Sequence, residues 1–429
     1  MKTIFALSAL GLLSAGALIT VGASKAGPVK ATYAESVAGI LNKNCVSCHR
    51  PGEVAPFSLI GYDNAKKYAA MIASVTKQGV MPPWKAVEGH GEFKDAKRLT
   101  AEEIEILGTW AKDEAPRGDA KSEPKAPEFT SAWALGKPDL VLSSKTEITV
   151  GPEGPDEYRN FVLENQSSET RYVTAIDCKP GNRKVVHHLV VFVDGSGVAK
   201  KRDAADKDGQ EGYTTFGGPG FNPVGILGAW APGYNVRHTP DGTAFELKSG
   251  QTMVMQIHYH RSGKTEKDRS ELGVYFTKTK PAKIARFGIF VDPTLQITPG
   301  EKSFRVTRSF KIPAEMTMYA VMPHMHLLGR VMKVDAKTPD GKAIPLIYIK
   351  DWDFNWQMQY EFKKPVVLPA GTVVTVEAVF DNSAANPRNP NSPPKLVTFG
   401  EETTDEMFVL LFTQTSALDQ PFFEIGSGR

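Results

Sequence analysis

The sequence contains few cysteines. Only three occur in 429 residues, and two of them, Cys45 and Cys48, are three positions apart. The third, Cys178, stands alone. This number and spacing exclude a disulfide scaffold, so any sheets in the chain must be held together by packing and hydrogen bonds.

Strong net charge and long apolar runs are also scarce. The 51 basic and 48 acidic residues nearly cancel, which argues against nucleic acid as a partner. Beyond residue 26 no apolar stretch is long enough to span a bilayer, so we predict no stable membrane insertion. Gly217 to Gly233 is rich in glycine but lacks a Gly-Lys-Ser/Thr pattern, and we expect a loop rather than a nucleotide site.

The N-terminus has the features of a secretory signal. Lys2 is followed by an apolar run from Ile4 to Val21 and by small residues from Ala23 to Ala26. We predict a signal peptide over residues 1–26. The first cysteine after this run is Cys45, so a lipoprotein is not expected.

The pentapeptide that begins at Cys45 is typical of covalent haem attachment. Cys45 and Cys48 have the spacing at which two thiols bond the porphyrin vinyl groups, and His49 then falls below the iron as proximal ligand. We therefore predict one covalent haem c. Export together with haem attachment indicates the periplasm of a Gram-negative bacterium.

Two helical patterns flank this motif. One covers Tyr33 to Asn42, and the other begins at a capping box, Thr100 to Glu103, and continues to Trp110. Residues 31–115 resemble the cytochrome c family, and the resemblance implies a distal iron ligand. Met81 is the best candidate, because the two prolines that follow it stiffen the loop.

Other assignments for residues near this candidate remain open. Met81 is alternatively a core side chain, and His90 is an alternative sixth ligand. Met71 has helical spacing in an apolar segment, and we expect it in the core. Cys178 is either a buried small hydrophobic residue or a thiol associated with copper.

The composition then changes twice. Residues 116–137 are rich in Pro, Lys, Asp, Glu and Ser and predict a linker. Beyond them valine, isoleucine and aromatic residues predict strands, with a turn at Pro339 to Gly341 in a hairpin. We predict two antiparallel β-sandwiches, at 138–282 and 283–429. The expected strands are 172–176, 185–193, 253–260, 284–291, 332–336, 344–349, 366–380 and 407–415.

Six of the nine histidines form three clusters in this region. His324 and His326 share one face of an extended strand, so both can chelate one ion, and His258 with His260 has the same spacing. Neighbours such as His187 and His188 face opposite ways on a regular strand. They can bind one metal only at a strand end, at a bulge or through different ring nitrogens. Three clusters with flanking methionines favour copper.

Four motifs in order carry a family resemblance: 186–192, 255–259, 324–329 and 404–407. They resemble the copper type II, ascorbate-dependent monooxygenases, the group of dopamine β-monooxygenase and the peptidylglycine α-hydroxylating enzyme. The resemblance covers roughly residues 138–425. It implies two β-sandwiches with one copper on each, facing an open solvent-filled cleft.

The resemblance also implies the ligands and their roles. His187, His188 and His258 would hold an electron-transfer copper, and His324, His326 and Met407 a catalytic copper that binds oxygen. His260 is a spare ligand, an outer-sphere group or a solvated histidine. At the places of the family's carboxylate-binding residues this chain has Met322 and Val409, which favours a neutral or apolar substrate.

The combined expectation is a haem-fed dicopper monooxygenase. It would hydroxylate a C–H bond of a small organic substrate with O2, using electrons from a periplasmic donor. Three alternatives stay open: an electron-transfer protein with closed copper sites, a reversible copper-binding protein, and a copper oxidase or dehydrogenase that passes electrons to haem.

Overall fold

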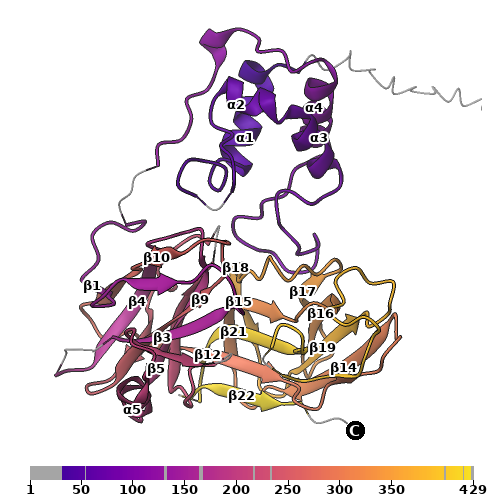
Figure 1. Cartoon of the computed structure of the whole chain (residues 1–429). Helices are drawn as coiled ribbons and strands as arrows, with labels where there is room; N and C mark the ends of the chain where they lie inside the picture. The colour runs from indigo at the N-terminus through magenta and orange to yellow at the C-terminus, as the bar shows by residue number, and fades with distance from the viewer. Residues whose placement is uncertain are drawn as a thin grey trace, which may run out of the picture.

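The computed structural model describes residues 31–53, 55–129, 133–163, 168–215, 218–231, 234–400, 402–418 and 420–426. The predicted signal peptide lies outside the described residues. The described chain is mostly β-sheet, with several antiparallel sheets and a small helical region near the N-terminus, which confirms this much of the expected fold (Figure 1). No helix in these ranges is long and apolar enough to cross a bilayer.

The helical region surrounds its own apolar core. Thr100 caps the last long helix and forms the predicted capping box with Glu103. Trp110 and Leu41 are fully buried in the core that the helices share. The elements are a π-helical turn (Tyr33–Val37), α1 (Ala38–Asn44), α2 (Tyr62–Lys67), α3 (Ala69–Lys77), α4 (Ala101–Lys112) and a 3-10 turn (Ala120–Ser122).

The beginning of the predicted linker belongs to this helical region. The carbonyl groups of Pro116 and Arg117 accept hydrogen bonds from the backbone N–H groups of Tyr33 and Ala34, both at 2.9 Å. The indole of Trp110 also donates to the Pro116 carbonyl. The first turn of a helix has N–H groups without intrahelical partners, and the chain after α4 supplies acceptors for them.

One nine-stranded sheet runs through the whole β-region. In spatial order it consists of β1 (Leu140–Ser143), β11 (Glu271–Thr277), β4 (Arg171–Lys179), β8 (Thr243–Leu247), β12 (Lys283–Val291), β21 (Val409–Ser416), β15 (Met316–His324) and β18 (Tyr360–Leu368), with β22 (Phe422–Ile425) beside β12.

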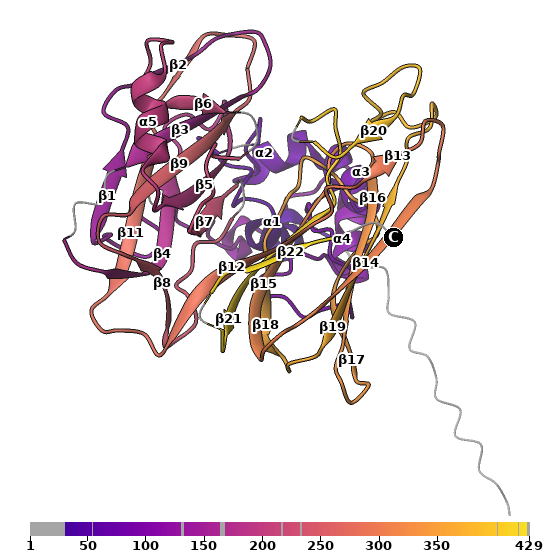
Figure 2. The same ribbon diagram turned by 90° about the horizontal axis from the view of Figure 1, so that it is seen from below.

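Two smaller sheets cover this sheet, one on each half. The N-terminal half carries β6 (Tyr213–Thr215), β3 (Glu157–Leu163), β9 (Thr252–Tyr259), β5 (Val186–Asp194) and β7 (Gly225–Trp230). The C-terminal half carries β14 (Phe304–Lys311), β19 (Val373–Phe380), β16 (Gly329–Lys337) and β17 (Ala343–Ile349). Each half encloses its own hydrophobic core between its two sheets (Figure 2).

Three short elements complete the fold. Helix α5 (Val198–Ala205) follows β5. The remaining strands form two-stranded pairs, β2 (Ile148–Val150) with β10 (Glu266–Asp268) and β13 (Gln296–Ile297) with β20 (Val397–Thr398).

The boundary between the halves differs from the expectation. We predicted two separate antiparallel sandwiches, but β12 pairs in parallel with β8, with Lys283 opposite Thr243 and Ala285 opposite Phe245. A second parallel pairing joins β12 to β22. The predicted boundary between residues 282 and 283 therefore falls within one continuous sheet. The first strand of the C-terminal half, β12, pairs with β8 of the N-terminal half.

Two other predictions about strands were wrong. The segment 366–380 is not one strand, since β18 ends at Leu368 and β19 begins at Val373. A tight turn separates them, in which Gly371 has a φ of 85° that favours glycine. The glycine-rich loop contains strand β7. The hairpin of β16 and β17 is confirmed, with Gly341 at a φ of 90° in its turn.

Residues 84–95, here called the strap, fasten the helical region to the sheets. Ala86 pairs with Ile349 of β17, and Phe93 pairs with Phe362 of β18. Trp84 packs edge-on against the ring of Tyr360, with the centroids 5.1 Å apart. The helical region thereby lies over the junction of the two halves (Figure 1).

Candidate metal centres

Three histidines of the N-terminal half come together on adjacent strands. The potential ligand atoms of His187, His188 and His258 all lie within 4.8 Å of one another. The register of β5 against β9 shifts between Val186 and His188, so that His188 lies opposite His258. This β-bulge is the irregularity that two neighbouring histidines need if they are to face one site.

The Nδ1 atoms of these histidines converge. His188 Nδ1 lies 3.0 Å from His187 Nδ1 and 3.4 Å from His258 Nδ1. The other nitrogen of His258, Nε2, donates to Asp156 Oδ2 at 2.8 Å, because a carboxylate only accepts. His258 Nδ1 therefore carries a lone pair. Imidazole nitrogens that converge in this way can all act as donors to one cation, and the donor set fits a metal ion.

Asp156 also binds the exposed His260. Its Oδ1 accepts a hydrogen bond from His260 Nδ1 at 3.0 Å. Burial raises the pKa of Asp156, but the hydrogen bond and charge of His258 outweigh it and hold the pKa below its usual range. Sequence reasoning missed Asp156, since it lies just before β3 outside any motif. His260 belongs to this outer layer of the site.

The environment keeps His187 and His188 neutral. Burial, followed by the charge of His258, lowers the pKa of His187 to about 4. Burial holds the pKa of His188 well below its usual range, and His324 of the second cluster is among the charges that add to this shift. The two histidine clusters therefore lie close enough to influence each other. Neutral imidazole is the form that binds metals.

The second cluster lies at the end of β15. His324 is the last residue of that strand and His326 follows it in a turn, with ring centroids 5.1 Å apart. His324 Nδ1 bonds to Gln357 Oε1 at 2.6 Å, and His326 Nδ1 donates to the carbonyl of Asp405 at 3.2 Å. In both cases the nitrogen that makes the contact is Nδ1. Burial is the main cause that lowers the pKa of His324 to about 3 and also lowers that of His326.

A buried carboxylate joins this turn to the segment of Met407. Glu406 accepts hydrogen bonds from the backbone N–H groups of His326 at 2.8 Å, Leu328 at 2.6 Å and Met407 at 3.0 Å. Burial raises the pKa of Glu406 to about 7. Met407 is half-buried and lies two residues before β21, not on the strand as expected. Met325, between the histidines, is buried in the core.

The residues predicted to attach haem form a tight turn after α1. The backbone N–H groups of Cys48 and His49 both bond to the carbonyl of Cys45, at 3.1 and 3.0 Å. Both cysteines are free thiols. His49 Nδ1 donates to the carbonyl of Phe57 at 3.3 Å, which leaves Nε2 available as a ligand. Burial raises the pKa of Cys45 to about 12.

The alternative candidates have different surroundings. Met81 follows α3, half-buried, with its backbone N–H bonded to the Val75 carbonyl. His90 lies on the C-terminal half, with Nε2 at 2.9 Å from Asp335 Oδ1. The prediction that Met71 is a core residue was wrong, because it is 50% exposed. Cys178 is buried in the N-terminal core, as the hydrophobic interpretation expects.

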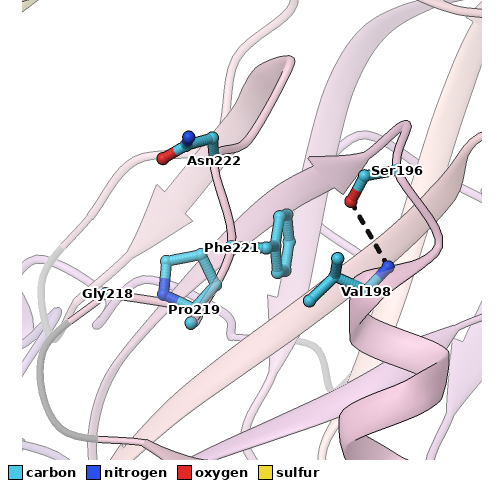
Figure 3. Close-up of a pocket in the computed structure, with 7 residues that line it drawn as sticks. Ser196, Val198, Gly218, Pro219, Phe221 and Asn222 are labelled. Atoms are coloured by element: carbon cyan, nitrogen blue, oxygen red, sulfur yellow. Dashed lines mark hydrogen bonds between the residues drawn. The ribbon is translucent and has the colours of Figure 1, made fainter.

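A surface hollow elsewhere is unrelated to these clusters. Ser196 and Val198 line one side and residues 218–222 the other (Figure 3). It lies past the C-terminal end of β5, whereas the histidines lie at the beginning of that strand. A nine-residue strand is about 30 Å long, so the hollow is remote from His187 and His188.

A protein-family match covers the residues of the second cluster, His324, His326 and Met407. Residues 280–416 match the model of the copper type II ascorbate-dependent monooxygenase C-terminal domain. DBH-like monooxygenase protein 1 of Gallus gallus is 23% identical over 230 residues, 48% of this chain and 37% of that protein. Its Homo sapiens counterpart is 24% identical over 217 residues, 46% of this chain and 35% of that protein.

This chain therefore spans little more than a third of the length of these curated relatives. Among solved structures, the major capsid protein P2 of bacteriophage PM2 aligns with 65% of this chain and 97% of its own, at 10% identity and a TM-score of 0.25. That score is too low to indicate a shared fold. Residues 280–416 thus match the C-terminal domain of copper type II ascorbate-dependent monooxygenases, and the chain is similar to DBH-like monooxygenase protein 1.

Proposed function

We propose that this protein is a dicopper monooxygenase that receives electrons through a covalent haem and hydroxylates a C–H bond of a small organic substrate with O2. The observation that carries the proposal is the pair of histidine clusters: Nδ1 atoms converge on one another at the first and are held by protein acceptors at the second. The family match to residues 280–416 supports copper at the second cluster.

The donors fit two coppers of different character. Three imidazoles would hold the first copper, and this set suits both oxidation states. Two imidazoles and the thioether of Met407 would hold the second, a softer set that favours Cu(I). When bound, the second copper would supply the activation of O2, and the first would supply an electron.

The protein's own residues orient these ligands. Asp156 fixes the proton of His258 on Nε2, and Gln357 and the Asp405 carbonyl fix the rings of the second pair. Glu406 holds the turn of His326 next to Met407. Such outer partners set the tautomer and the ring orientation of metal-binding histidines. Met322 and Val409, near this pair, favour a neutral or apolar substrate.

The helical region fits a haem. Cys45 and Cys48 are free thiols on one turn, and His49 has one nitrogen fixed and the other available. We propose Met81 as the distal ligand. Bound covalently, the haem would replace ascorbate as the immediate one-electron source, in keeping with a signal peptide and a periplasmic location.

Reaction under 18O2 with a panel of small organic compounds tests the function. We expect one labelled oxygen atom in the product and none in a control with H2 18O and unlabelled O2. Product oxygen from water, or repeated anaerobic turnover with an artificial acceptor, would instead indicate a dehydrogenase or oxidase. Metal binding without any product would indicate electron transfer or copper storage.

A further inference from the structure

The turn that bears the haem-attachment residues reaches the N-terminal half through an ion pair. Glu53 follows His49 by four positions, and its Oε2 lies 2.9 Å from Arg183 Nη1. The Glu53 side chain is only 11% exposed and that of Arg183 31% exposed. Since water screens this pair less than a surface pair, it contributes more to docking than an exposed salt bridge does.

Arg183 belongs to the turn that leads into the three-histidine site. The backbone N–H groups of Val185 and Val186 bond to the Asn182 carbonyl, and β5 then begins, with His187 as its second residue. The N–H of His260 bonds to the Val185 carbonyl at 2.7 Å, which ties this turn to the end of β9. The position of Arg183 is therefore coupled through the backbone to both strands that carry the first metal site.

Side chains around the pair hold it in place. Arg50 also forms an ion pair with Glu53, so the carboxylate lies between two guanidinium groups. The Arg183 guanidinium lies over the ring of Trp230, 5.5 Å from its centroid. Because Arg50 remains, replacing Arg183 removes this one contact between the two regions without leaving Glu53 uncompensated.

We propose that Glu53 and Arg183 are positioning residues that hold the haem-attachment turn against the His187, His188 and His258 site, so that this site and not the second one exchanges electrons with the haem. The inference rests on the proposed function. Each exchange moves one electron from ferrous iron to a cupric ion and makes or breaks no bond. A one-electron protein donor would restore the ferrous state.

An alternative route for electrons leads from the helical region to the C-terminal half. Trp84, near the proposed ligand Met81, packs on Tyr360, which lies opposite Val321 on β15, three residues before His324. Electrons that entered there would reach the second site first. The experiment must therefore separate the two sites as well as test the docking.

Docking is measured by hydrogen–deuterium exchange of residues 45–53 in the full chain without copper. Arg183→Glu should raise exchange by about tenfold, equivalent to about 1.4 kcal/mol. Arg183→Gln should give a smaller rise, and Arg183→Lys should stay close to wild type. The control is Lys43→Gln, which breaks an exposed pair with Glu103 inside the helical region. Unchanged exchange in Arg183→Glu would overturn the docking.

The site of entry is measured by anaerobic reoxidation of the ferrous haem in Cu(II)-loaded protein. Reoxidation should stay fast in Met407→Ala, which keeps the first site, and should be lost in His258→Ala. Arg183→Glu should slow it by about tenfold, and Arg183→Lys should restore it. Fast reoxidation in His258→Ala would overturn the inference and assign entry to the side of Trp84.

These experiments distinguish a failure of the docking inference from a failure of the proposed function. A chain that shows the expected exchange and reoxidation but incorporates no oxygen from O2 supports the docking while the monooxygenase proposal fails. Oxygen incorporation with unchanged exchange in Arg183→Glu leaves the function standing and refutes the docking.

Discussion

The two histidine clusters present opposite edges of the imidazole ring. At the first, Nδ1 atoms converge and a carboxylate holds Nε2 of His258. At the second, the Nδ1 atoms of His324 and His326 are held by the amide of Gln357 and a backbone carbonyl. A carboxylate partner makes an imidazole a stronger donor than a neutral partner does. The first site is thus better suited to a higher oxidation state, and the second to Cu(I).

Removing one ligand from each cluster tests this comparison with the largest expected effect. Met407→Ala should lower monooxygenase turnover by at least about 100-fold and leave one copper bound, since a thioether ligand is lost only from the second site. His258→Ala should instead lose the copper of the first site and keep the copper of the second. Copper content and X-ray absorption of the reduced protein measure both. Loss of both metals in either variant would show that the clusters do not bind independently.

Glu406 should matter for the second cluster alone. Glu406→Ala leaves the buried N–H groups of His326, Leu328 and Met407 without an acceptor, and we expect a loss of about 3–5 kcal/mol in the free energy of unfolding. Glu406→Gln keeps one acceptor oxygen and should lose less. Chemical denaturation measures both. If the alanine variant unfolds like wild type, the carboxylate does not organise this turn.

Asp156 should matter for the first cluster alone. Asp156→Asn weakens the partner of His258 Nε2, and we expect copper affinity at that site to fall by about 10- to 100-fold with the second site unchanged. Competition with a chelator measures the affinities. His260→Ala is the control, because it removes the other partner of Asp156 and should have little effect. Equal losses at both sites would contradict separate outer partners.

The copper-free protein should lose stability in acid. Burial keeps His187 and His324 neutral, with pKa values of about 4 and about 3, whereas the unfolded chain takes up protons near pH 6.5. The contribution of the two neutral histidines to the free energy of unfolding is complete above pH 6.5 and falls as the pH drops toward 4. Each histidine adds a slope of at most about 1.4 kcal/mol per pH unit.

Denaturation of the copper-free chain at pH 7 and pH 5 measures this slope. His187→Gln and His324→Gln should each reduce it. A slope that stays the same in both variants would locate the acid sensitivity in other groups.

The sequence predicted features that depend on neighbouring residues. The capping box at Thr100, the turn at Gly341 and the need for a strand end, a bulge or different ring nitrogens at His187 all follow from spacings of a few residues. Asp156, Gln357 and Glu406 could not be found this way, because each meets its histidine only through tertiary folding. Met407 came from the family resemblance, and its link to the histidine turn runs through the side-chain carboxylate of Glu406.

The continuous sheet has a consequence for any attempt to divide the chain. A cut at residue 282 would separate β8 from β12 and leave the backbone groups of Thr243 to Phe245 and Lys283 to Ala285 unpaired. Exposed strand edges recruit other chains, so either fragment alone should aggregate. A chimaera of two related proteins should therefore fold only when β8 and β12 come from the same protein.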